Sequence, residues 1–147
     1  MTTLKNPPRN ILVPVDFSES SEKAASAAGA LAEKTGATVH LLHAYVIPVE
    51  SVGLAQTVSR QYVAQFVEES KVQLKELAAK ACPGVPLGPL LVESGDPRDV
   101  ILAEAEKLHV ELIVMGTHGR RGISRAILGS VAETVVRAAH CSVLVVR

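Results

Sequence analysis

The chain has 147 residues, of which 48% are hydrophobic and 20% are charged. This length suits one domain with a core of its own, and this composition excludes a disordered chain. Lysine and arginine total 15, as do aspartate and glutamate, so the formal net charge of +0 argues against a nucleic-acid binder that relies on bulk charge.

Residues 1–9 are predicted to form a flexible tail ahead of a single domain, residues 10–147. The tail lacks the apolar stretch of a secretory signal, and no run approaches the ~20 apolar residues of a membrane helix. The two cysteines, Cys82 and Cys141, lie far apart in the sequence, which fits unreactive thiols in a reducing compartment. We therefore expect a cytoplasmic protein without a membrane partner.

The first strand is predicted over residues 11–15, where Pro14 removes a backbone donor and should end the pairing near that point. Asp16 and the serines that follow it are typical of the start of a helix. The helix carries small residues at steps of three and four, which lets it lie close to a sheet. Gly36 is typical of a helix stop.

The middle of the chain continues the alternation of strands and helices. A second strand, residues 38–44, is followed by an irregular stretch, residues 45–57, and by a long helix from about residue 59 to residue 81. A third strand is predicted over residues 90–93. The sequence Gly95-Asp96-Pro97 then indicates another helix, with the aspartate as its cap and the proline in its first turn.

A fourth strand, residues 112–115, leads into a glycine-rich loop, a helix over residues 130–140 and a last strand, residues 142–147. Strands that alternate with helices predict a parallel open sheet covered by helices on both faces, an α/β fold of Rossmann-like or flavodoxin-like type. In such a sheet, ligands bind beyond the carboxyl ends of the strands, where the strand order reverses.

The loop after the fourth strand has the character of a phosphate-binding loop. Gly116, Gly119 and Gly129-Ser130 follow the spacing Gly-x2-Gly-x9-Gly-Ser, and no acidic residue lies between Gly116 and Ala132. Glycines allow a ligand to approach the backbone closely, and a helix start offers free N–H groups and a favourable dipole. The alternative is a turn-rich connection that ends in an ordinary serine cap.

This spacing resembles the ATP-binding subgroup of the universal stress protein family. The strings Met-Gly-Thr-His-Gly-Arg-Arg-Gly at residues 115–122 and Val-Pro-Val-Asp-Phe-Ser at residues 13–18 are also similar to that family, over about residues 10–147 in all. The resemblance implies five parallel strands in the order 3-2-1-4-5, as in the adenine nucleotide alpha hydrolase-like proteins. The order then reverses beside Asp16 and Gly116.

The resemblance also implies which residues bind ATP. Asp16 would face the nucleoside, and the backbone of Ala44 would meet the edge of the adenine. Pro14 and Met115 would form walls around the base and ribose. Gly116 would lie against the ribose and the first phosphate. The phosphates would accept hydrogen bonds from the backbone N–H groups of four residues, Gly119, Gly129, Ser130 and Val131, and from the hydroxyl of Ser130. An Mg²⁺ or Mn²⁺ ion would bind through the phosphates and water, because the loop has no carboxylate.

Some of these polar residues have simpler explanations. Asp16 can serve as a helix cap alone or as cap and ligand together. His43 is expected to be a hydrogen-bonded core residue, and strand alternation places it on the opposite face from His40, so the two are poor metal co-ligands. His118 could contact phosphate or solvent, and solvent is the favoured alternative. Three basic residues, Arg120, Arg121 and Arg125, could either contact phosphate or lie on a solvated surface, and the two alternatives are equal.

These features favour a nucleotide-dependent regulatory module of the stress response, with little or no hydrolysis. A slow ATPase or phosphotransferase is the first alternative, although the chain has no Gly-x4-Gly-Lys-Ser/Thr motif and the loop has no evident general base. A dimeric interaction module that does not depend on nucleotide is the second. The sequence does not indicate a downstream protein partner.

The last strand is also expected to form a homodimer interface. In the order 3-2-1-4-5 it lies at an edge of the sheet, and it is apolar, β-branched and almost uncharged. Such an edge exposes unpaired N–H and C=O groups and favours pairing with another chain. Universal stress proteins commonly dimerise through this strand, so the resemblance and the chemistry both favour a two-fold dimer in which residues 143–146 cross the axis.

Overall fold

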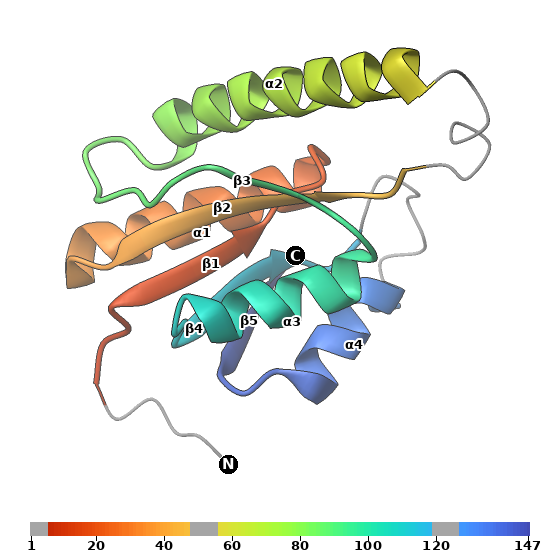
Figure 1. Cartoon of the computed structure of the whole chain (residues 1–147). Helices are drawn as coiled ribbons and strands as arrows, with labels where there is room; N and C mark the ends of the chain where they lie inside the picture. The colour runs from red at the N-terminus through yellow and green to blue at the C-terminus, as the bar shows by residue number, and fades with distance from the viewer. Residues whose placement is uncertain (1–5, 48–55, 119–126) are drawn as a thin grey trace.

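The computed structural model describes residues 6–47, 56–118 and 127–147 (Figure 1). Within them, strands and helices alternate along the chain as expected. The strands are β1 (Asn10–Pro14), β2 (Thr38–Tyr45), β3 (Leu91–Ser94), β4 (Leu112–Gly116) and β5 (Ser142–Val146). The helices are α1 (Glu19–Thr35), α2 (Gln56–Ala81), α3 (Pro97–Lys107) and α4 (Ser130–Ala138).

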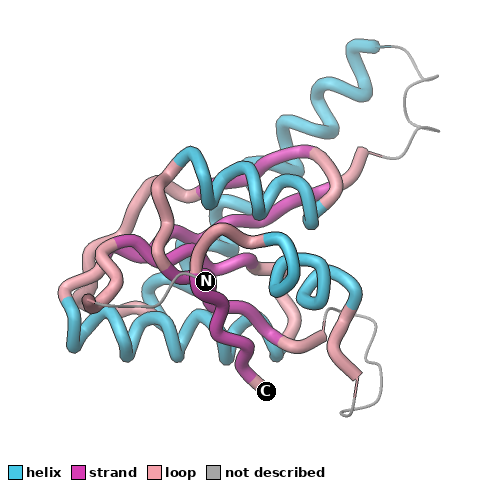
Figure 2. The backbone as a smooth tube through the Cα atoms, turned by 90° about the horizontal axis from the view of Figure 1, so that it is seen from below, coloured by secondary structure: helices cyan, strands magenta, loops and turns pink. Residues whose placement is uncertain are grey.

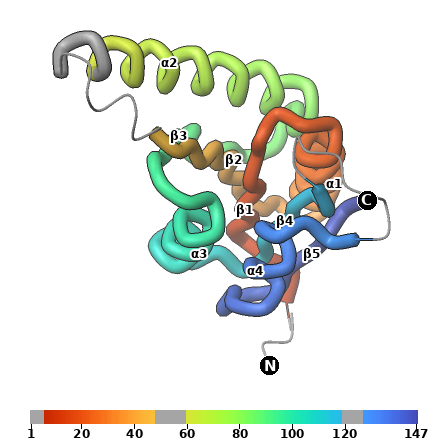
Figure 3. The backbone as a smooth tube through the Cα atoms, turned by 90° about the vertical axis from the view of Figure 1, so that its right-hand side faces the viewer, coloured from red at the N-terminus to blue at the C-terminus, as the bar shows by residue number. Residues whose placement is uncertain are grey.

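The five strands form one parallel sheet in the order β3-β2-β1-β4-β5, which confirms the predicted fold class. Figure 3 shows the strands in this order. The central strand β1 pairs with β2 on one side and with β4 on the other, so that Leu12 lies opposite His40 and Ile113. The order therefore reverses between β1 and β4, where the sequence predicted the binding crevice.

Helices cover both faces of the sheet and divide the core in two. On one face, α1 and α2 pack against odd-numbered strand residues such as Ile11, Val13 and Leu41. On the other, α3 and α4 pack against residues such as Leu12, Leu42 and Ile113. Side chains that alternate along a strand supply both layers, which is why the strands are apolar throughout.

Local signals in the sequence set the ends of several elements. Ser18 caps α1 by accepting a hydrogen bond from the N–H of Ser21, and Gly36 ends the helix with a φ of 74°. Asp96 caps α3 by accepting from the N–H of Arg98. The strand β1 ends at Pro14, as its missing N–H predicted.

Helix α2 begins at Gln56, earlier than the sequence predicted, and only its C-terminal half packs closely on the core. Leu74, Leu77 and Ala78 are buried there, whereas Tyr62 is 68% exposed. Figure 2 shows the N-terminal half of α2 extending past the sheet. Helix α4 ends at Ala138, short of the predicted residue 140. Among the described residues, no helix is both long and apolar enough to cross a membrane.

Candidate functional site

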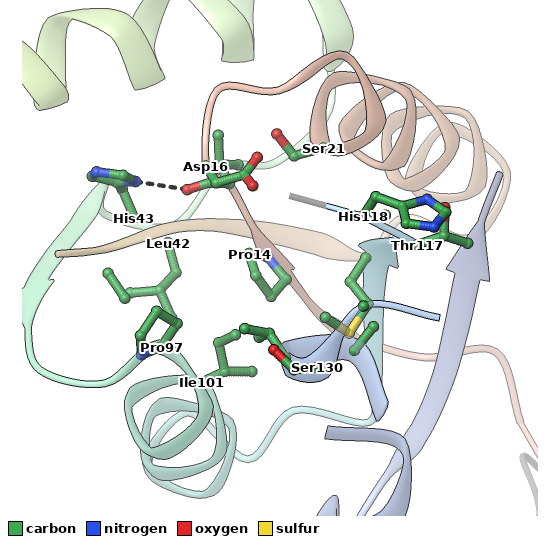
Figure 4. Close-up of a pocket in the computed structure, with 17 residues that line it drawn as sticks. Pro14, Asp16, Ser21, Leu42, His43, Pro97, Ile101, Thr117, His118 and Ser130 are labelled. Atoms are coloured by element: carbon green, nitrogen blue, oxygen red, sulfur yellow. Dashed lines mark hydrogen bonds between the residues drawn. The ribbon is translucent and has the colours of Figure 1, made fainter. Parts of the chain in front are cut away.

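A cavity of about 520 Å³ lies at the carboxyl ends of β1, β2 and β4 (Figure 4). Its walls come from these strand ends, from the turn after β1, and from the first turns of α3 and α4. This position is the one that the reversal of strand order predicts for a ligand. A cavity of this size suits a small organic molecule.

The floor of the cavity is apolar. Pro14 ends β1, Leu42 belongs to β2, and Met115 belongs to β4. Pro97 and Ile101 from α3 complete the floor, and Figure 4 shows both near Leu42. Leu42, Ile101 and Met115 also belong to the hydrophobic core on the α3 and α4 face, so the core holds this surface in place.

The turn after β1 places a carboxylate at the rim. Asp16 lines the cavity, and its Oδ1 accepts hydrogen bonds from the backbone N–H of Ser18, at 3.0 Å, and from the Ser18 hydroxyl. Ser18, rather than Asp16, is the residue that caps α1. Asp16 is therefore not the helix cap itself. It accepts hydrogen bonds from the cap residue, Ser18, and it also lines the cavity.

The first turn of α4 faces the cavity without a side-chain cap. Gly129 is the N-cap residue and has no side chain to accept a hydrogen bond from the first turn, and Ser130 is the first helical residue. The first intrahelical hydrogen bond runs from the Glu133 N–H to the Gly129 carbonyl. The N–H groups of Ser130, Val131 and Ala132 therefore have no acceptor within the helix. All three residues line the cavity, so an ordinary serine cap does not describe this helix start.

Gly129 and Gly116 are explained by close packing. The N–H of Gly129 donates to the Thr117 carbonyl at 2.7 Å, and a Cβ at Gly129 would lie 2.9 Å from that same oxygen. A Cβ at Gly116 would lie 2.2 Å from Ser20 Oγ at the start of α1. In this arrangement the Gly129 N–H is engaged within the protein, which leaves the donors of the first helical turn to face a ligand.

Two histidines line the cavity. His43 is 8% exposed, and its Nδ1 lies 2.7 Å from the Val15 carbonyl oxygen. The expectation of a buried, hydrogen-bonded His43 is therefore confirmed. Of the two alternatives for His118, solvent was favoured over phosphate, but the residue lines the cavity, with its Nδ1 2.8 Å from Thr117 Oγ1 and its Nε2 buried.

The cap of α3 carries a charged pair on either side of Pro97 in the sequence, and Pro97 lines the cavity. Arg98 donates from its backbone N–H and its side chain to the Asp96 carboxylate, with 2.6 Å between Nη2 and Oδ2. These hydrogen bonds lower the pKa of Asp96 to about 2. Asp96 is therefore negatively charged at neutral pH, and the hydrogen bonds from Arg98 fix its carboxylate at the start of α3.

The structure brings together eight of the nine residues that the resemblance implied. The residues among them that line the cavity are Pro14, Asp16, Ala44, Met115, Gly116, Gly129, Ser130 and Val131. Gly119 lies outside the described residues, as do Arg120, Arg121 and Arg125. Sequence reasoning missed the contributions of Leu42, Pro97 and Ile101. The Asp96-Pro97 helix start after the third strand was a usable signal, because it marks another carboxyl end of a strand.

No group of three or more histidine, cysteine, aspartate or glutamate side chains within the described ranges could hold a metal ion. Asp16 is the carboxylate that lines the cavity, and the first turn of α4 presents N–H groups to it. The arrangement offers a negatively charged ligand hydrogen bonds and a helix dipole, together with an apolar surface.

Comparison with known proteins places the chain in a family. The model of the universal stress protein family matches residues 8–147. Universal stress protein MJ0531 of Methanocaldococcus jannaschii is 39% identical over 142 residues, which cover 95% of this chain and 82% of that protein.

Solved structures share the fold. The structure of the protein MJ0577 is 29% identical and superposes with a TM-score of 0.80 over 94% of each chain. A universal stress protein in complex with cAMP is 23% identical, with a TM-score of 0.68 over 97% of this chain and 98% of that one. At that identity the second likeness shows the fold alone.

Proposed function

The chain belongs to the universal stress protein family, and we propose that it is a member that binds ATP in the cavity between β1 and β4. Occupancy of the cavity would regulate which protein partner the chain engages during stress. The proposal rests on the match between the chemistry of the cavity walls and that of a nucleoside triphosphate.

The observation that carries the proposal is the uncapped start of α4. Helices α1 and α3 use the side chains of Ser18 and Asp96 to satisfy first-turn N–H groups, whereas α4 has glycine at its N-cap. Hydrogen bonds to a charged group contribute roughly 1.5–3 kcal/mol each. Three such donors would supply much of the ~8 kcal/mol that micromolar binding requires.

The rest of the cavity suits a nucleoside. The apolar floor of Leu42, Pro97 and Ile101 would receive the base, while Asp16 would accept hydrogen bonds from the ribose hydroxyls. Pro14 and Met115 also line the cavity and would contact the base and ribose. A ligand with both an apolar part and an anionic part fits these surfaces better than a uniformly charged one.

An Mg²⁺ or Mn²⁺ ion would accompany the nucleotide. Because N–H groups rather than carboxylates line the start of α4, the ion would be held by phosphate oxygens and water. Its charge would reduce repulsion among the phosphates.

We favour a binding role over rapid catalysis. Asp16 supports the cap of α1, and His43 is bonded to a backbone carbonyl, so both have structural partners already. A slow ATPase or phosphotransferase remains the alternative. Phosphate release with Mg²⁺ should stay far below the ~10 s⁻¹ of a median enzyme.

The start of α4 allows a sharp test of phosphate binding. Proline is accommodated at the first helical position, and Gly129, with a ψ of 155°, already has the extended conformation that a residue before proline requires. The Ser130→Pro variant removes one N–H and the hydroxyl, whereas Ser130→Ala removes the hydroxyl alone. We expect Ser130→Pro to weaken ATP binding by at least about tenfold, and Ser130→Ala to weaken it less.

Isothermal titration calorimetry with ATP and with cAMP measures this difference, and circular dichroism checks that the helix content is unchanged. Equal ATP affinity in the wild type and Ser130→Pro would remove the start of α4 from the site. Mass spectrometry of small molecules released from freshly purified protein identifies the resident ligand. Preferential binding of cAMP would replace the triphosphate with a cyclic monophosphate.

A further inference from the structure

The ladder between β1 and β2 stops abruptly at the cavity. The N–H of Val15 donates to the Leu42 carbonyl at 2.7 Å. In a regular parallel ladder, the Ala44 N–H would next donate to the Val15 carbonyl, and the Phe17 N–H would donate to the Ala44 carbonyl. Neither hydrogen bond forms among the described residues.

The imidazole of His43 takes the place of the first missing bond. Its Nδ1 lies 2.7 Å from the Val15 carbonyl oxygen, and Figure 4 shows this bond beside Asp16. A carbonyl can only accept, so Nδ1 carries the proton and donates. The side chain thus occupies the acceptor that the Ala44 N–H would otherwise use.

The surrounding rings hold the imidazole in this position. The ring centroids of His43 and Phe17 are 4.7 Å apart, and those of His43 and Phe66 are 6.1 Å apart. Phe17 has a φ of 62°, an uncommon conformation for a bulky residue, which turns the backbone away from β2. This turn accounts for the second missing bond, between Phe17 and Ala44.

Ala44 is left with both of its backbone groups facing the cavity. The Gly95 N–H donates to the Tyr45 carbonyl, so the polar groups of Tyr45 point toward β3. Backbone groups of successive strand residues point to opposite edges, so those of Ala44 point toward the side of β1, beyond the point where β1 ends. Ala44 lines the cavity there and is partly exposed.

We propose that His43 is a positioning residue that keeps the Ala44 N–H free, beside the C=O that the turn at Phe17 leaves open, to read the edge of a purine base. His43 thereby sets a preference for 6-aminopurines over 6-oxopurines. The inference rests on the proposed binding of ATP. An adenine donates from its 6-amino group and accepts at N1, which complements one carbonyl and one N–H. A 6-oxopurine presents an acceptor and a donor in the reverse order, so the same placement of the base opposes like groups.

The first experiment needs no ligand and measures hydrogen–deuterium exchange at the Ala44 amide by NMR. In His43→Leu the Val15 carbonyl loses its donor, and we expect the Ala44 N–H to bond to it and to exchange about tenfold more slowly than in the wild type. His43→Asn places an amide N–H near the position of Nδ1, and fast exchange should return. Unchanged exchange in His43→Leu would overturn the inference.

The second experiment compares the affinities for ATP and ITP, which differ at the 6-position and N1. We expect the wild type to prefer ATP by about tenfold, His43→Leu to lose most of this preference, and His43→Asn to retain it. His40→Leu removes another buried imidazole of β2 that does not line the cavity, so it should leave the ratio unchanged.

The outcomes separate this inference from the proposed function. A wild type that binds no nucleotide would refute the proposed function, while the exchange experiment would still decide the role of His43 in the ladder. A wild type that binds ATP, with an ATP-to-ITP ratio that His43→Leu does not alter, would refute the inference alone. Equal losses of ATP and ITP binding in His43→Leu would also contradict it, because they would indicate general damage to the cavity.

Discussion

Individual side chains in this protein acquire their roles from neighbours that are distant in the sequence. His40 and His43 belong to the same strand and are both buried, yet they differ in their partners. His43 donates to a backbone carbonyl at the cavity. His40 has its Nε2 3.3 Å from Asn10 Oδ1, while its Nδ1 is buried and has no hydrogen-bond partner in the described part of the chain. Protonation of His40 would therefore place a proton on an atom that has no acceptor.

This difference predicts that acid destabilises the protein through His40. Burial lowers the pKa of His40 below its usual value of 6.5. The unfolded chain therefore binds the proton more readily, so stability is lost as the pH falls below the unfolded pKa and is retained above it. His40→Gln, which can keep the contact to Asn10, should show a smaller fall in the denaturation midpoint between pH 7.5 and 5.5 than the wild type.

Urea denaturation at the two pH values measures this effect, and the comparison of wild type with variant cancels the contributions of other titrating groups. Parallel pH dependence in the two proteins would show that His40 does not carry the acid sensitivity.

At the scale of elements, the described helix caps differ: side chains cap α1 and α3, whereas α4 begins at a glycine. The Ser18 hydroxyl links the two functions at the start of α1, because it accepts from the Ser21 N–H and donates to Asp16. Helix α4 has glycine at the corresponding position and leaves its first turn available. The choice of cap residue thus determines which helix offers hydrogen bonds to a ligand.

Removal of the α1 cap should affect both stability and binding. Ser18→Ala loses the hydroxyl that caps the helix, which costs about 1 kcal/mol of unfolding free energy in typical helices. It also removes one of the donors to Asp16, so we expect weaker ATP binding. Ser26→Ala, at an exposed position within α1, is the matched control and should change neither quantity appreciably. Chemical denaturation and calorimetry measure the two effects, and a Ser18→Ala variant as stable as the control would refute the capping role.

At the scale of the whole molecule, the sheet has an apolar edge. Strand β5 pairs with β4 on one side, and Leu144 is 43% exposed. The Thr117 N–H donates to the Val146 carbonyl, so the backbone groups of Val146 point toward β4. By alternation, those of Val143 and Val145 point to the free edge. These groups would form the shared ladder of the homodimer that we propose.

The direction of these groups makes Val145→Pro a selective test. Proline there removes an N–H that points away from β4, so the fold should persist while the dimer weakens by at least about tenfold in dissociation constant. Val145→Ala keeps the N–H and serves as the control. Analytical ultracentrifugation measures both. A well-folded wild-type monomer at micromolar concentration would refute the dimer, and a dimer unaffected by Val145→Pro would place its interface elsewhere.

Much of the fold could be predicted from the sequence because its signals are local. Apolar runs, the cap at Asp96, the stop at Gly36 and the end of β1 at Pro14 each depend on residues within a few positions of one another. The start of α2 was placed too late because no clear cap precedes it. The glycine spacing and the resemblance also indicated eight residues that prove to share one cavity.

Tertiary structure alone decided how the cavity is completed. Pro97 and Ile101 reach it because α3 packs over β2, and His43 bonds to Val15, 28 positions earlier, because the parallel register brings the two strand ends together. The spacing of residues along a chain does not encode which backbone acceptor a buried imidazole will find. The open N–H that we propose for Ala44 depends on that contact, and its open C=O depends on the turn at Phe17, so neither could be recognised before β1 and β2 were placed side by side.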